Sequence, residues 1–168
     1  MSFFFDSVER FVAGTVGQPG ERAFFIQARN SNRLVTVAIE KLQVAALAER
    51  LEIIINDLRK NDSDIRQLTT EVDDAPLELP IDSEFEVGSI SMSWDESSQL
   101  ISIELFEIAT DEAENQDYLR VNLSISMCSA FIKRSKALIA AGRLPCPFCG
   151  IAIDPQGHLC PRANGYRR

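Results

Sequence analysis

The feature that most constrains the fold is a change of hydrophobic period, from about two residues to about 3.6, that occurs twice along the chain. Apolar and polar side chains alternate in residues 10–17, 22–29 and 33–40, as in strands with one buried face. In residues 42–60 the apolar side chains recur three and four positions apart, which indicates an amphipathic helix. The sequence GQPG at 17–20 favours a hairpin turn. The first half therefore predicts three strands followed by a helix.

The same order of periods returns in the second half. Gly88 interrupts the first alternating run and predicts a bulge, while Ser129 and Gly142 suit the N-cap and the stop of a final helix. We interpret residues 11–60 and 85–142 as an internal duplication, on the basis of element order and not of matching residues. The elements expected here are strands at 85–94, 99–108 and 118–126 and a helix at 129–142.

Two such β-β-β-α units can join their strands into antiparallel sheets, with both helices packed on the apolar faces. The predicted fold class is therefore α+β, with residues 1–142 as the body. An acidic linker at 61–84 separates the two units, and the chain from Glu71 to Glu86 has no basic residue. We expect much of this linker to be exposed and irregular.

Residues 143–168 hold three of the four cysteines and the only histidine. Cys146 and Cys149 form a C-x-x-C pair, and His158 and Cys160 form an H-x-C pair that follows. Three thiolates and one imidazole make a complete tetrahedral ligand set for Zn²⁺. Because protein side chains would fill all four positions and leave none for a catalytic water, the sequence predicts a structural zinc knuckle.

Two other uses of these cysteines stay open on the sequence alone. A redox C-x-x-C pair normally begins a helix after a strand, whereas Cys146 and Cys149 lie between prolines. A disulfide needs an oxidising compartment, and three clustered cysteines cannot all pair with one another. Cys128 lies in the apolar stretch SISMCSAF, so we interpret it as a small core residue and not as a further metal ligand.

Charge is distributed unevenly between the body and the tail. The whole chain carries −8, and the tail has four arginines against one aspartate, hence +3. Subtracting this +3 from −8 leaves −11 for residues 1–142. Phosphate contacts need clustered Lys and Arg, so the body is a poor candidate for binding nucleic acid. Contact with RNA is kept as an alternative for the basic tail.

The sequence gives no sign of a membrane or secretory segment. No apolar run approaches the ~20 residues of a membrane-spanning helix. The first residues, MSFFFDSVER, lack the basic start of a secretory signal. We therefore expect a cytoplasmic protein without membrane association, and a reducing cytoplasm also suits a thiolate zinc site.

Three stretches carry a family resemblance: RFVAGTVGQPGERAFFIQAR, VAIEKLQVAALAERL and CPFCGIAIDPQGHLCPRANGYR. They are similar to an actinobacterial family filed as domain of unknown function 3090. The resemblance covers nearly the whole chain, and the last stretch is the most specific. It implies no catalytic residue, because the family is uncharacterised. The family pattern marks Gly14, Gly17, Pro19, Gly20, Arg22, Gln27, Glu40, Lys41 and Gln43 in the body, and Cys146, Cys149, His158, Cys160, Arg162, Asn164 and Gly165 in the tail.

The favoured hypothesis is a zinc-binding protein that acts through contacts with another protein. Arginine and tyrosine anchor protein contacts well, and the tail has four arginines and Tyr166. An acidic surface would attract this +3 segment, either on the protein's own −11 body or on a partner. The candidate contact surface consists of Arg162, Asn164, Tyr166, Arg167 and Arg168.

An enzyme or a domain that binds a small ligand is the alternative, with a pocket near Arg22, Gln27, Glu40 and Lys41. Glu40 and Lys41 lie where a strand meets a helix, so capping and surface pairing explain them more simply. The sequence also shows no pair of nucleophile and general base. A Ser or Cys nucleophile would need a histidine beside it, and the only histidine is assigned to zinc.

Overall fold

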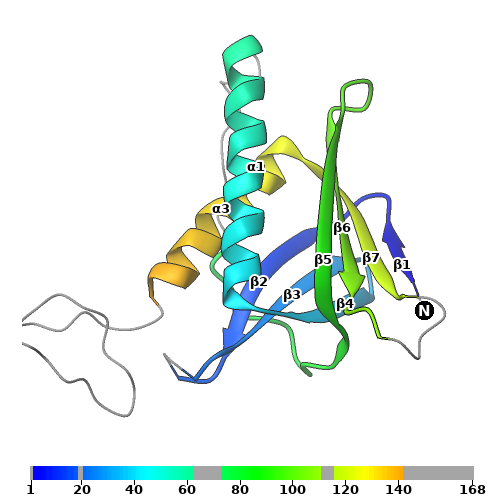
Figure 1. Ribbon diagram of the computed structural model, residues 1–168, viewed down its shortest axis with the longest axis vertical. Coiled ribbons are helices and arrows are strands. Elements are labelled where there is room, and N and C mark those ends of the chain that lie inside the picture. The colour runs from blue at the N-terminus through cyan, green and yellow to red at the C-terminus, as the bar shows by residue number, and fades with distance from the viewer. Residues whose placement is uncertain (1, 19–20, 63–72, 111–115, 142–168) are drawn as a thin grey trace, which may run out of the picture.

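The computed structural model describes residues 2–18, 21–62, 73–110 and 116–141. Within these ranges, seven strands form one mixed sheet in the order β1-β7-β6-β5-β4-β3-β2, accompanied by two helices (Figure 1). The predicted α+β class is confirmed. The strands are β1 (Phe3–Phe5), β2 (Arg10–Val16), β3 (Ala23–Asn30), β4 (Arg33–Ile39), β5 (Ser83–Asp95), β6 (Leu100–Glu107) and β7 (Tyr118–Ser124), and the helices are α1 (Lys41–Asn61) and α3 (Ile125–Ala140).

Two three-stranded antiparallel meanders make up most of the sheet. β2, β3 and β4 pair in succession and lead into α1, and β5, β6 and β7 do the same and lead into α3. The two meanders join through parallel pairing of β4 with β5, where the sequence predicted antiparallel pairing alone. The β-β-β-α order therefore occurs twice, side by side, and a common origin of the two halves stays a prediction.

The sheet is strongly curled, because its two end strands are consecutive in the chain. In a flat sheet, six steps of about 4.8 Å would place β1 about 29 Å from β2. The chain from Phe5 to Arg10 spans at most about 18 Å. Arg33, at the start of β4, donates a hydrogen bond to the Phe4 carbonyl at 3.0 Å, and its guanidinium lies 4.5 Å from the centroid of the Phe5 ring. The curl therefore brings β1 back to the first meander.

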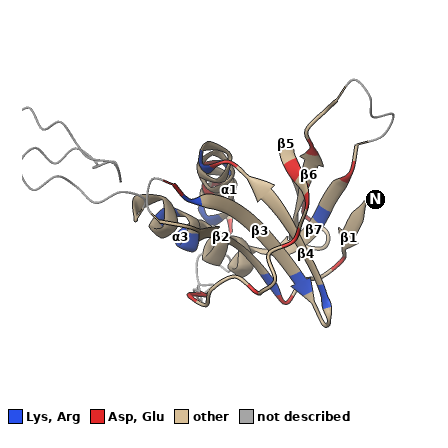
Figure 2. Ribbon diagram, turned by 90° about the horizontal axis from the view of Figure 1, so that it is seen from below, with Lys and Arg blue, Asp and Glu red and all other residues tan. Residues whose placement is uncertain are grey.

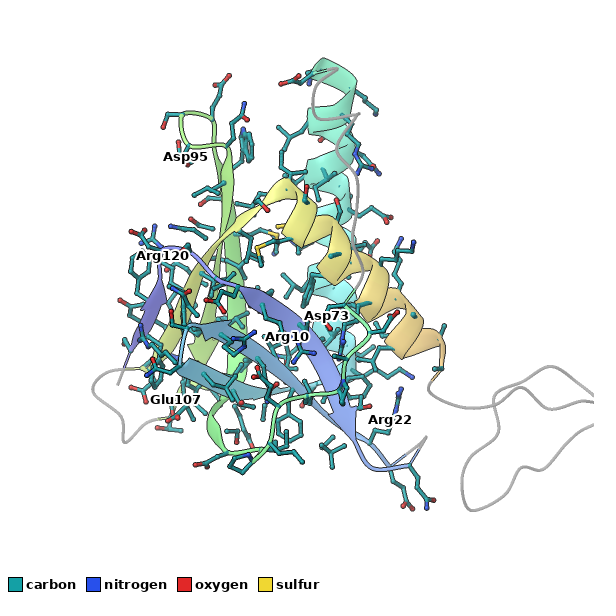
Figure 3. The ribbon with its side chains drawn as sticks, turned by 180° about the vertical axis from the view of Figure 1, so that it is seen from behind. Arg10, Arg22, Asp73, Asp95, Glu107 and Arg120 are labelled. Carbon is teal, nitrogen blue, oxygen red and sulfur yellow. The ribbon has the colours of Figure 1, made fainter. Side chains whose placement is uncertain are left out.

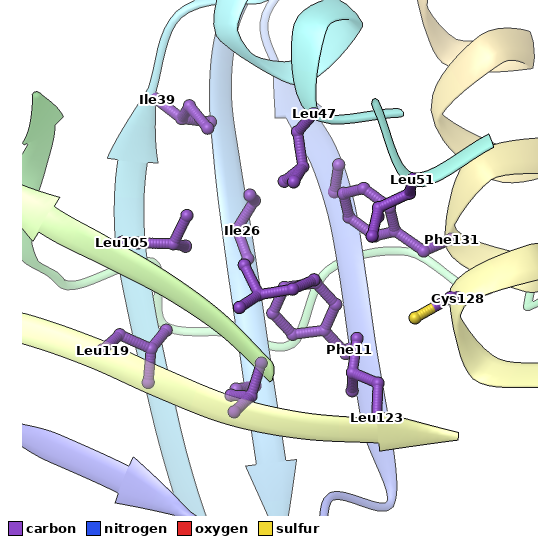
Figure 4. Packing of buried hydrophobic residues seen from close by; sticks show 14 of the residues in the cluster. Phe11, Ile26, Ile39, Leu47, Leu51, Leu105, Leu119, Leu123, Cys128 and Phe131 are labelled. Carbon is purple, nitrogen blue, oxygen red and sulfur yellow. The ribbon is translucent and has the colours of Figure 1, made fainter. Parts of the chain in front are cut away.

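The hydrophobic core fills the inside of this curl (Figure 4). The ring centroids of Phe11 from β2 and Phe131 from α3 are 5.1 Å apart. Leu47 and Leu51 extend from α1 into the same cluster. Cys128 on α3 is fully buried there, as predicted. The apolar helical face and the apolar strand faces predicted from the sequence thus meet in one core.

Gly88 sits at a shift in the register between β5 and β6, so the predicted bulge is confirmed. A Cβ atom at this position would lie 2.8 Å from the Ile108 Cα, which leaves no room for a side chain. Gln43 on α1 donates to the carbonyls of Val87 and Gly88 at 2.9 and 3.2 Å. The start of α1 is therefore fixed to the bulge by a side chain.

Two boundaries differ from the sequence predictions. α3 begins at Ile125, because Ser124 and not Ser129 is the N-cap: its hydroxyl accepts the Met127 amide at 3.2 Å. Ser129 lies buried inside the helix. The first strand, β1, was absent from the prediction, since three consecutive phenylalanines show no alternation. Among the described helices, neither combines the length and apolar character needed to cross a lipid bilayer.

Candidate functional site

The four proposed zinc ligands, Cys146, Cys149, His158 and Cys160, lie outside the described residues. The proposed contact surface from Arg162 to Arg168 lies outside them too. Within the ranges that are described, no three His, Cys, Asp or Glu side chains converge as a metal site would require. The metal site therefore stays a prediction that depends on ligand type and spacing.

Three of the four residues predicted to form a pocket lie at one end of the sheet. The register places Phe24 opposite Ile39, so Arg22 lies near the junction that holds Glu40 and Lys41. Arg22 donates to the Leu138 carbonyl of α3 at 3.0 Å and stacks over Phe24. Glu40 is the N-cap residue of α1, and its amide donates to Gln43 Oε1 at 2.8 Å. These contacts fit the capping explanation and do not join the residues around a ligand.

Gln27, the fourth of these residues, lies apart from the others in the middle of β3 and is 1% exposed. Its side chain points to the outer face of the first meander, which is the face opposite the core. There its Nε2 donates to Thr36 Oγ1 at 3.1 Å. Gln27 therefore belongs to a different surface from Arg22, Glu40 and Lys41.

A cavity of about 520 Å³ lies between β2 and α3. We call it the edge groove. Its volume is within the range of known ligand sites, roughly 300–1,000 Å³. Apolar side chains line much of it: Phe11, Val12, Met127, Ala130 and Phe131. Its polar lining residues are Glu9, Arg10, Asp73, Ser126 and Arg134.

Backbone groups of β2 face the edge groove, because β2 is an end strand of the sheet. In an antiparallel ladder alternate residues direct N–H and C=O toward the one neighbouring strand. The Ala13 carbonyl accepts Arg134 Nε at 2.7 Å, which shows that Ala13 is one of the residues facing away from β3. By the same alternation, the amide and carbonyl of Phe11 face away from β3 as well. Arg134 thus closes the edge at Ala13, and the groove lies beside Phe11.

Two arginines, Arg10 and Arg134, meet one carboxylate at the end of the groove. Figure 3 labels Arg10 and Asp73, which lie close together. Arg10 Nε lies 2.5 Å from Asp73 Oδ2, and Arg134 Nη1 lies 3.5 Å from Asp73 Oδ1. The side chains of Arg10 and Arg134 are only 10% and 12% exposed. The hydrogen bond from Arg10 is the main reason that the pKa of Asp73 lies below its usual value. Burial, together with the charge of Arg10, lowers the pKa of Arg134.

The segment 73–78, which we call the strap, continues from Asp73 across the outer face. Arg10 Nη2 donates to the carbonyls of Ala75 and Pro76 at 2.8 and 3.0 Å. Arg134 Nη1 donates to the carbonyls of Asp73 and Ala75 at 2.5 and 2.7 Å. The strap has no regular secondary structure and several of its residues are exposed, as expected for the linker. Its attachment to the sheet was not predicted.

The family assignment follows from comparison with known proteins. The family described as "Protein of unknown function (DUF3090)" matches residues 3–160. The chain belongs to the DUF3090 family. The resemblance noted in the sequence is thus confirmed, and the DUF3090 match contains every strand and helix described above together with the four proposed zinc ligands. Neither the curated proteins nor the solved structures contain a significant match to this chain.

Sequence reasoning missed Arg10, Asp73 and Arg134 in this DUF3090 chain. A signal was present for two of them. Arg10 lies one position before the buried Phe11, and Arg134 lies three positions after the buried Phe131. A charged side chain that is held beside a core residue must find a partner. Asp73 gave no signal, since the linker around it is uniformly acidic.

Proposed function

We propose that this DUF3090 chain is a cytoplasmic zinc-binding protein that acts through contacts with another protein. Cys146, Cys149, His158 and Cys160 would hold one structural Zn²⁺. The set fits zinc because three thiolates and an imidazole match its preference for sulfur and nitrogen ligands. The metal would give the tail a defined shape without a large core of its own.

The edge groove is the observation that favours a protein partner. A strand edge beside an apolar groove is the arrangement in which an extended segment adds to a sheet: its backbone pairs with the edge and its side chains enter the groove. Phe11 supplies the edge, and Met127 and Ala130 supply the apolar wall. The partner would therefore contribute an extended segment with apolar side chains.

The groove lies beside α3, and the tail follows α3 in the chain. Ala130 lines the groove, and α3 ends at Ala140, about 15 Å farther along the helix axis. A partner seated in the groove would thus lie within about 15 Å of the end of α3. Arg162, Tyr166 and the last arginines would add contacts to an acidic surface of that partner.

Enzymatic activity and RNA binding have less support in the described residues. Arg22 and Glu40 are engaged in contacts that hold helices, and Gln27 lies under the strap. Figure 2 shows basic and acidic positions interspersed along the described ribbon, whereas a phosphate backbone requires clustered Lys and Arg. For RNA contact through the tail, the tail alone would have to supply the clustered basic side chains.

The test is affinity purification of the tagged full chain from its own cells, compared between two variants of α3. Ala130→Glu places a charge in the edge groove, whereas Ala137→Glu places the same charge at an exposed position of the same helix. We expect the first variant to lose the partner and the second to retain it. Retention by both, with circular dichroism showing both folded, would contradict the groove as the contact site.

A further inference from the structure

The outer face of the first meander holds the strap almost entirely through side chains, as a peptide-binding domain holds a bound peptide. Gln27 is the clearest case. Its Oε1 accepts the Glu78 amide at 2.8 Å, and its Nε2 donates to the Glu78 carbonyl at 2.9 Å. One buried carboxamide thus pairs with both backbone groups of one residue, as a neighbouring strand would. Thr36 fixes the carboxamide orientation.

The charges of the outer face complement those of the strap. Arg29 Nε lies 3.1 Å from Glu78 Oε2, and Arg10 and Arg134 surround Asp73 at the other end. The outer face and α3 together present three guanidinium groups to the strap, although the whole chain carries −8. Glu9 also pairs with Arg29, at 2.9 Å, and offsets one of these charges. Such a local excess of positive charge selects for an acidic segment.

A notch for one apolar side chain lies between the two charged ends. Gly14 in β2 has no side chain, and Leu77 occupies the space above it: a Cβ atom on Gly14 would overlap the Leu77 side chain. Val12, on the same outer face of β2, is buried without belonging to the core cluster. The outer face therefore has an apolar position for a leucine between two positions that bind carboxylates.

We propose that the outer face is a binding site for an acidic, extended peptide, and that the strap occupies this site within the chain. The peptide carries two carboxylates five residues apart, with a leucine just before the second, as Asp73, Leu77 and Glu78 do. A partner segment with this pattern displaces the strap and takes over its contacts. The site adjoins the edge groove and shares Arg10, Val12, Asp73 and Arg134 with it. Gly14, Gln27 and Arg29, which hold the strap at Leu77 and Glu78, are not among the groove's lining residues. The proposal rests on those contacts and does not depend on the function proposed above.

The experiment uses the full chain and a fluorescent peptide with the sequence of residues 73–80, DDAPLELP. The triple variant Asp73→Ala/Leu77→Ala/Glu78→Ala removes the strap side chains that compete for the face. We expect the peptide to bind this variant at least about tenfold more tightly than the original chain, as measured by fluorescence anisotropy. Adding Arg29→Met to the triple variant should reverse most of the gain.

A control peptide with asparagine and glutamine in place of the first aspartate and the glutamate should bind at least about tenfold more weakly to the triple variant. If that variant fails to fold, the original chain decides the matter by NMR: excess DDAPLELP should shift the side-chain amide signals of Gln27, and the control peptide should not. A folded triple variant that does not bind DDAPLELP would overturn the proposal. If that variant does not fold, unchanged Gln27 signals in the original chain would overturn it as well. In either case the strap would have a structural role alone.

Discussion

At the scale of single residues, the contact between Asp73 and the two arginines is the feature that sequence patterns miss. Arg10 and Asp73 are 63 positions apart, and Arg134 is 61 positions from Asp73 in the other direction. Hydrophobic period describes which face a residue occupies, but it does not describe which distant residue a charge meets. Cys128, by contrast, was predicted correctly, because an apolar neighbourhood is a local signal.

The strap should loosen in acid. Because the folded state lowers the pKa of Asp73, the stabilisation is fully present above the ordinary carboxyl pKa and is lost as the pH falls through the lowered value. Asp73→Asn should therefore cost about 1 kcal/mol at pH 7, a figure reduced for solvent screening, and much less near pH 2. Urea unfolding at the two pH values measures this. The exposed residue Asp82 provides the control variant, Asp82→Asn, and an equal loss at both pH values would contradict the assignment.

Cys128 should be unreactive in the folded protein. Burial raises the pKa of its thiol to about 12, so the reactive thiolate is absent at neutral pH. A thiol reagent added to the folded, zinc-loaded chain should modify almost nothing. After chelation of the metal it should modify the three tail cysteines, and Cys128 only after denaturation. Rapid modification of Cys128 in the native chain would show that the core at α3 opens easily.

At the scale of elements, the hydrophobic period predicted most of the strands and helices. The capping signals were less successful in predicting where the helices begin. Six of the strands and both helices were found within a few residues of their ends. Ser129 is a good N-cap residue by type, yet Ser124 has that role, because α3 follows β7 without a loop. β1 escaped prediction since its place depends on pairing with Leu119 and Val121, more than a hundred positions away.

The bulge in β5 should not tolerate a side chain. In Gly88→Ala the new Cβ atom would meet the backbone of Ile108, which cannot rotate away as a side-chain tip can. We expect a loss of about 2–3 kcal/mol in the free energy of unfolding, measured by chemical denaturation. The neighbouring exposed Ser89→Ala should lose less than about 0.5 kcal/mol. A Gly88→Ala variant as stable as the original chain would mean that the bulge can rearrange.

At the scale of the whole molecule, the body and the tail should be separable. Purified chain should contain about one zinc atom, as measured by elemental analysis, because a complete Cys3His set binds the metal strongly. Cys149→Ser should lose this zinc while the body keeps its circular dichroism spectrum, since the described residues have their own core. Freshly purified chain without zinc would contradict the metal site.

Removal of residues 143–168 should abolish co-purification of the partner and leave the melting temperature of the body nearly unchanged. This result is expected if the tail extends outward from α3 to another protein. The opposite result, a lower melting temperature with the partner retained, would show that the tail packs on its own acidic body. A deletion that changes neither quantity would remove the proposed role of the tail.

The curl of the sheet has a consequence for the protein while it is still on the ribosome. β1 is made first, but its pairing partner β7 begins at Tyr118, so more than a hundred further residues must be translated before β1 can pair. At roughly 5–20 residues per second, this delay is on the order of ten seconds. Throughout that time Phe3, Phe4 and Phe5 have no partner strand, and such an exposed aromatic run is the kind of segment that chaperones bind and that aggregation begins from. β1 is thus translated before the other strands of the sheet and is the last to be paired, and the nascent protein depends on keeping β1 soluble until β5, β6 and β7 emerge.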